Sequence, residues 1–121
     1  MSDTLELSPS TRTAIAALTL AELEFGVSAA AVRGQALEVR VRSARLAAAH
    51  AKYGDGLPFD GAAAIAYGSI TTAVLRRGRN PRARSVDLLI AAVALSRGAA
   101  LVTTQPDEFA GLDDLLEIRG A

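Results

Sequence analysis

The chain contains no cysteine, which excludes a disulfide scaffold and any metal site built from thiolates. Packing must therefore hold the fold, and a reducing compartment is compatible with this composition. The one histidine, His50, lies among alanines in a predicted helix, where a surface or half-buried role is expected. We find no histidine-based triad, no nucleophile elbow and no phosphate-binding glycine loop.

Long hydrophobic runs are also missing, since none approaches the roughly 20 residues that a membrane span needs. The first six residues carry acids where a signal peptide would carry basic residues. We therefore expect a cytoplasmic protein without a membrane segment. With 121 residues, 50% of them hydrophobic and 21% charged, the chain suits a single globular domain.

The net charge is zero, which argues against a general electrostatic grip on nucleic acid. The positive charge is nevertheless almost all arginine, and five arginines crowd one segment: Arg76, Arg77, Arg79, Arg82 and Arg84. Such a local patch suits phosphate, because arginine offers a bidentate fork. A solvated helix end and loop explains it equally well.

Short apolar segments alternate with helical patterns along the chain. Residues 13–18 predict a strand that runs into a helix, with Gly26 or Gly34 as interruptions, and residues 36–50 predict an amphipathic helix. Residues 57–59 suit a brief edge strand, and Asp60 is placed to cap a helix over 61–77 that Gly78 ends. A helix over 86–95 and strands over 100–103 and 115–118 follow. This order predicts an α/β domain with a mostly parallel sheet flanked by helices.

Three acids fall where ligands gather in such sheets, at the carboxyl ends of strands: Glu22, Asp87 and Glu108. Each has a structural explanation of its own. Thr19 and Glu22 have the spacing of a capping box, Asp87 complements a helix dipole, and Glu108 suits a turn cap. As a set among apolar neighbours they would repel one another unless a cation joins them. Carboxylates without cysteine suit Mg²⁺ or Mn²⁺ rather than zinc.

Four blocks, in order, resemble those of PIN-domain ribonuclease toxins of the VapC type. They are residues 18–26 (LTLAELEFG), 57–60 (LPFD), 87–92 (DLLIAA) and 101–112 (LVTTQPDEFAGL). The resemblance implies a single PIN-like domain over residues 1–121 and a Mg²⁺- or Mn²⁺-dependent endoribonuclease. It further implies the toxin of a toxin–antitoxin pair, with a cognate antitoxin and a homodimeric state.

Carried over by position, the resemblance makes Glu22, Asp87 and Glu108 the catalytic, metal-binding residues. Gln105 stands where the family commonly has Asn or Asp, so we expect it to support a ligand at most. The five arginines listed above are the candidate RNA-binding residues.

The resemblance departs at the front, where the family has an apolar strand that ends in an aspartate. Asp3-Thr4 imitates that dipeptide, but residues 8–13 are too few for the dozen or so that a parallel crossover needs. We therefore treat residues 1–12 as a poorly defined segment and expect the first strand and first acid to be missing. Either the recorded start lies downstream of the true one, or this is a shortened relative.

Two other hypotheses stay open on the sequence. The first is a catalytically impaired, truncated PIN-domain remnant that acts only through antitoxin binding or dimerisation, because losing one ligand weakens an acidic metal site. The second is an unrelated α/β domain in which the acids are only caps.

Overall fold

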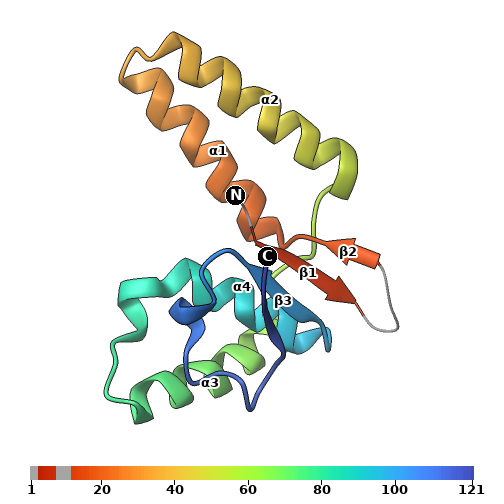
Figure 1. Cartoon of the computed structure of the whole chain (residues 1–121), viewed down its shortest axis with the longest axis vertical. Coiled ribbons are helices and arrows are strands. Elements are labelled where there is room, and N and C mark those ends of the chain that lie inside the picture. Colours follow the sequence, from red (N-terminus) through yellow and green to blue (C-terminus); the bar gives the residue numbers. More distant parts are fainter. Residues whose placement is uncertain (1–2, 8–11) are drawn as a thin grey trace.

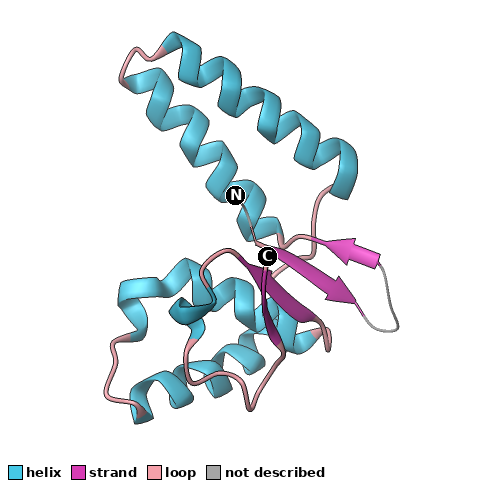
Figure 2. Ribbon diagram, viewed as in Figure 1, coloured by secondary structure: helices cyan, strands magenta, loops and turns pink. Residues whose placement is uncertain are grey.

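A computed structural model describes residues 3–7 and 12–121, except for the side chain of Arg84. Helices cover one side of a small sheet, and a helical hairpin extends away from it (Figures 1 and 2). The elements run in the order β1 (Thr4–Leu7), β2 (Arg12–Ala14), α1 (Ala17–Val32), α2 (Ala36–Tyr53), α3 (Gly61–Arg76), η1 (Pro81–Arg84), α4 (Ser85–Ser96), β3 (Ala100–Thr103), η2 (Pro106–Phe109) and β4 (Ile118–Gly120).

The sheet has the strand order β2-β1-β3-β4. The α/β class is confirmed, but the expectation of a mostly parallel sheet is wrong, because among the described strands of this sheet β3 and β4 alone pair in parallel. β1 runs antiparallel to both β2 and β3. Only residues 8–11 separate β1 from β2, and so short a connection allows an antiparallel hairpin but no parallel crossover.

The segment 1–12, expected to be poorly defined, contains β1. Residues 1–2 and 8–11 of that segment lie outside the described residues. β1 occupies the place beside β3, with Leu5 opposite Leu101, and both leucines are fully buried. The hairpin therefore covers the edge of β3 that a missing first strand would have exposed.

The core lies between the sheet and the pair α3–α4. α4 buries Ala91, Ala92 and Ala94 completely, and α3 contributes the fully buried Ile70. Small side chains on α4 let the two helices pack closely. The Asp60 side chain accepts a hydrogen bond from the Ala63 N–H at 3.0 Å, so the predicted cap of α3 is confirmed.

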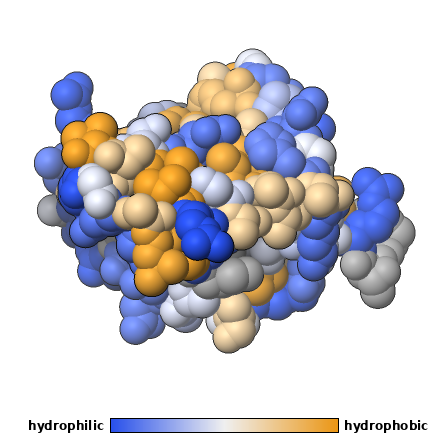
Figure 3. All heavy atoms as spheres, turned by 90° about the horizontal axis from the view of Figure 1, so that it is seen from above, coloured by the Kyte–Doolittle hydropathy of each residue, from blue (hydrophilic) through white to orange (hydrophobic). Residues whose placement is uncertain are grey.

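The hairpin of α1 and α2 is less buried than the rest. α1 continues through Gly26 without a break, and α2, predicted as amphipathic over 36–50, has no fully buried residue. Large apolar side chains are exposed on it, among them Phe25 at 73% and Leu37 at 72%. Viewed from above, hydrophobic surface lies between hydrophilic patches (Figure 3).

The remaining elements differ from the sequence expectations in detail. Leu57 makes only an isolated parallel bridge to Ala16 instead of an edge strand. The last strand begins at Ile118, later than the predicted 115–118, and Ala121 N–H donates to the Thr103 carbonyl at 2.8 Å. None of the helices in the described residues has the length and apolarity to cross a membrane.

Candidate active site

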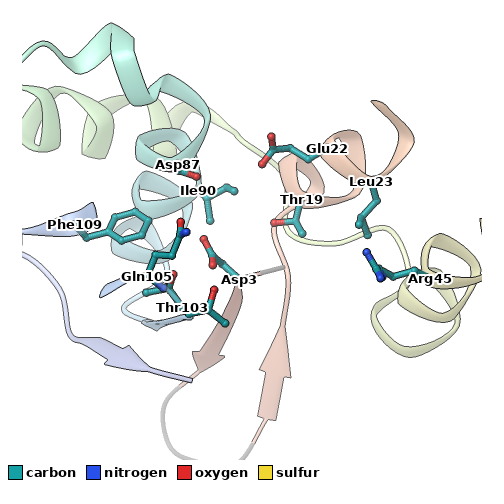
Figure 4. Close-up of a pocket in the computed structure, with 11 residues that line it drawn as sticks. Asp3, Thr19, Glu22, Leu23, Arg45, Asp87, Ile90, Thr103, Gln105 and Phe109 are labelled. Atoms are coloured by element: carbon teal, nitrogen blue, oxygen red, sulfur yellow. Dashed lines mark hydrogen bonds between the residues drawn. The ribbon is translucent and has the colours of Figure 1, made fainter. Parts of the chain in front are cut away.

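Three carboxylates from separate parts of the chain line one cavity of about 220 Å³. They are Asp3, just before β1, Glu22 in α1 and Asp87 in the first turn of α4 (Figure 4). Thr103, at the end of β3, lines the cavity beside them. Two of the three predicted acids are thus brought together, and the third position is taken by Asp3.

Asp3 was set aside on sequence grounds, and the structure corrects that expectation. A parallel pairing of the first strand would need a crossover that residues 8–13 cannot provide. An antiparallel hairpin needs no crossover, because β2 folds back along β1 while β1 pairs with β3 and Asp3 lies at the cavity. Asp3 therefore lies on the N-terminal side of its strand. The Asp-Thr dipeptide was the only signal in the sequence that pointed to it.

Glu22 is positioned by the start of α1, which differs from the predicted one. α1 begins at Ala17 after an extended Ala16, and the Ala17 N–H donates to the Leu57 carbonyl at 2.8 Å. Because Thr19 lies inside the helix, Thr19 and Glu22 form no capping box, and that interpretation is wrong. Glu22 is left largely exposed at the cavity.

The Thr19 hydroxyl is an unusual feature of this cavity. Thr19 is only 3% exposed, and its Oγ1 has no hydrogen-bond partner among the described residues. A buried polar group without a partner costs roughly 1–3 kcal/mol. Figure 4 shows the hydroxyl on the side of α1 that faces Asp3. The cavity therefore presents an unused hydrogen-bonding group next to the acids.

The acids disfavour one another's charged forms. Burial raises the pKa of Asp3 above its usual value, a hydrogen bond from Thr103 lowers it in part, and the charge of Asp87 raises it further. Glu22 is largely exposed, yet its partial desolvation at the cavity raises its pKa, and the charges of Asp87 and Asp3 add to that effect. A bound cation would relieve this repulsion.

Glu108 lies outside this group. It is half-buried in η2 and lines a neighbouring cavity with Arg77 and Arg79, while the buried Phe109 lines both cavities. Gln105 lines the acidic cavity, and its backbone N–H donates to Thr103 Oγ1 at 3.1 Å. The assignment of Glu108 as a metal ligand stays a prediction.

The predicted arginines with described side chains do not line the acidic cavity. Arg76, Arg77, Arg79 and Arg82 are exposed, and none lines the acidic cavity; the side chain of Arg84 lies outside the described residues. The basic residue that does line it is Arg45 of α2, which the sequence did not single out. His50 is exposed near the end of α2, as expected.

The donor set suits a hydrated divalent cation. Within residues 3–7 and 12–121, no three acidic, histidine or cysteine side chains are close enough to hold one ion directly. Mg²⁺ usually binds through one or two carboxylates and keeps several waters. Oxygen ligands whose charges repel one another around a cavity fit that requirement, and they do not fit zinc.

A family model described as "PIN domain" matches residues 3–115, from Asp3 onwards. The chain belongs to the PIN-domain family. The match covers every element from β1 to the end of the turn before β4, which includes all residues of the acidic cavity.

Curated and solved relatives place this PIN domain in the VapC type. It is 42% identical over 103 residues to "Ribonuclease VapC5" of Mycobacterium tuberculosis. That alignment covers 84% of this chain and 70% of the relative. It also matches the crystal structure of VapBC-5 from Mycobacterium tuberculosis, described as a member of the VapBC family of toxin-antitoxin systems. That match has a TM-score of 0.69 at 36% identity, covering 87% of this chain and 77% of that one.

Proposed function

We propose that this VapC-type PIN domain is a divalent-cation-dependent endoribonuclease and the toxin of a toxin–antitoxin pair. The observation that carries the proposal is the convergence of Asp3, Glu22 and Asp87 on one cavity, where burial and the neighbouring carboxylates raise the pKa values of Asp3 and Glu22. The name of the ribonuclease relative, VapC5, supports RNA as the substrate class.

The positions of the three acids suit the binding of a divalent cation. Asp87, on the rigid α4, and Glu22, on α1, face the cavity from opposite sides and would hold Mg²⁺ or Mn²⁺ with Asp3. Such an ion would neutralise charge on a phosphodiester and activate a water for its hydrolysis. Thr103 lines the cavity with Asp3 and favours the charged form of that carboxyl, since it lowers the pKa of Asp3 in part.

A cognate antitoxin, a homodimer and a cytoplasmic location belong to the same proposal. The VapBC description of the solved relative supports an antitoxin partner. An amphipathic antitoxin segment would suit the alanine- and leucine-rich helices, as in helix-in-groove recognition.

A second candidate is the impaired remnant, which binds its partner but does not cut RNA. It is favoured by the lack, within the described residues, of three groups near enough to ligate one ion directly. Titration calorimetry with Mg²⁺ and Mn²⁺, combined with cleavage of labelled single-stranded RNA, separates the two. Metal binding at millimolar concentration or tighter with metal-dependent cleavage supports the nuclease, and absence of both supports the remnant.

A further inference from the structure

A nuclease with an acidic centre has to attract a polyanion to a site that repels it. One part of the cavity is negative, because it is lined by the acids Asp3, Glu22 and Asp87. A basic group nearby is therefore needed to hold the RNA strand. The arginines from Arg76 to Arg82 do not line this cavity. Among the described residues that do, the one basic residue is Arg45.

Arg45 is available for an external anion. Arg42, one turn earlier on α2, is engaged, because it bonds to Glu38 at 2.9 Å and to the Gly26 carbonyl at 2.9 Å. Arg45 is exposed and makes no hydrogen bond or ion pair within the part of the chain that the structure describes. The two arginines thus have different tasks, one tying α2 to α1 and the other facing the cavity.

Arg45 also does not serve as a counter-ion for the acids. No ion pair joins Arg45 to Asp3 or Glu22 in the part of the chain that the structure describes. In Figure 4 it lies beside Leu23, on the other side of Thr19 from Asp3 and Asp87. The cavity therefore has an acidic part and a basic part, which suits a chain of phosphates that passes from one to the other.

We propose that the Arg45 guanidinium binds a backbone phosphate of the RNA strand next to the one held at the acids. The inference rests on the proposed function, because that function supplies the strand. A guanidinium binds phosphate through a planar fork of donors, and the contact is independent of base sequence. The unpartnered Thr19 hydroxyl, between the two parts, is a second sign that the cavity takes a polar ligand.

The test compares Arg45→Ala and Arg45→Lys with Arg40→Ala. Arg40 is an exposed arginine on the same helix that does not line the cavity, so it controls for the loss of one positive charge. Binding of a labelled single-stranded RNA is measured by fluorescence anisotropy in EDTA, over a series of salt concentrations. Circular dichroism melting confirms that each variant is folded.

We expect Arg45→Ala to weaken binding about tenfold and to reduce the slope of log K against log salt by about 0.7, the value for one phosphate contact on a single strand. Arg45→Lys should keep the slope while losing part of the affinity, because it keeps the charge without the fork. Equal affinity and slope for Arg45→Ala and Arg40→Ala would overturn the inference.

Cleavage of the same RNA by the parent in Mg²⁺ separates this inference from the proposed function. A parent that binds RNA through Arg45 but does not cut it would end the nuclease proposal and leave the phosphate site standing. If the parent cuts RNA while Arg45→Ala binds it like Arg40→Ala, the nuclease proposal stands and the phosphate site at Arg45 is overturned. A parent that binds no RNA would overturn both.

Discussion

The Thr103 side chain lies with Asp3 on the wall of the acidic cavity and lowers the pKa of that carboxyl in part, which links the end of β3 to the residue that precedes β1. Thr103 is 2% exposed, so its position is fixed by packing, and its Oγ1 also accepts the Gln105 N–H. Asp3, near the start of the chain, therefore lies beside β3, the most buried strand of the sheet. The geometry of the acidic cavity thus depends on β3 as well as on the helices.

Asp87→Asn should reduce RNA cleavage by at least about a hundredfold, because it removes a charged ligand from the cavity. The fold should survive, since a first-turn acid contributes only about 0.3–1 kcal/mol to its helix. Cleavage in Mg²⁺ and thermal unfolding measure the two effects. A variant that cuts RNA as fast as the parent would remove Asp87 from the site.

Glu108→Gln is the matched comparison, since the sequence assigns Glu108 to the metal while the structure places it in the neighbouring cavity. We expect a smaller loss of cleavage than for Asp87→Asn and unchanged Mg²⁺ binding by calorimetry. Equal losses for the two variants would restore Glu108 as a ligand.

Thr19→Val tests the buried hydroxyl. Without metal or RNA the variant should be more stable by about 1 kcal/mol, because a polar atom without a partner is removed at nearly constant volume. Cleavage should fall about tenfold if that hydroxyl contacts the bound strand or its water, and Thr19→Ser should retain it. Denaturant unfolding and cleavage rates provide the readings; a less stable variant with full activity would contradict this account.

Glu22→Gln should stabilise the metal-free protein at neutral pH. The pKa of Glu22 is raised in the folded state above its usual value of 4.5. Protonation of Glu22 therefore stabilises the folded parent below pH 4.5, and this stabilisation is lost as the pH rises through the folded-state pKa. The gain from Glu22→Gln should therefore be largest at neutral pH and vanish below pH 4.5. Melting temperatures of the parent and Glu22→Gln, measured without metal from below pH 4.5 to neutral pH, test this prediction. A stability gain of Glu22→Gln that grows on acidification would contradict it.

Gly56→Ala should destabilise the fold more than Gly54→Ala. Both glycines have a positive φ, of 75° and 65°. A Cβ on Gly56 would lie 2.9 Å from the Ala17 backbone nitrogen, whereas one on Gly54 meets open space. We expect about 1 kcal/mol for Gly54→Ala and clearly more for Gly56→Ala, by urea unfolding. Comparable losses would show that backbone strain alone accounts for both.

Much of the fold follows from local signals. The apolar run of β3 was predicted with its observed bounds, and α3 lies between its predicted cap Asp60 and Gly78, ending one residue before the expected position. These elements depend on periodicity and on capping chemistry, both of which are readable in a few neighbouring residues.

The missed features depend on contacts between distant segments. The exclusion of Asp3 on sequence grounds assumes parallel pairing, whereas β1 pairs antiparallel with both β2 and β3. Thr19 and Glu22 have the spacing of a capping box, yet the Ala17–Leu57 hydrogen bond starts α1 two residues earlier. Arg45 faces the cavity through the packing of α2 on α1, and the helical pattern alone does not distinguish it from Arg42.

The tightly packed alanines of α4 imply a particular spectrum of loss-of-function mutations in a genetic screen. Ala91, Ala92 and Ala94 are completely buried, so added methyl groups there would have to fit inside the core, and Asp87 lies on the same helix. A change as mild as alanine to valine would shift α4 and tilt its acidic end away from its neighbours. Survivors of toxin expression should therefore carry conservative replacements in this helix as well as changes to the carboxylates themselves.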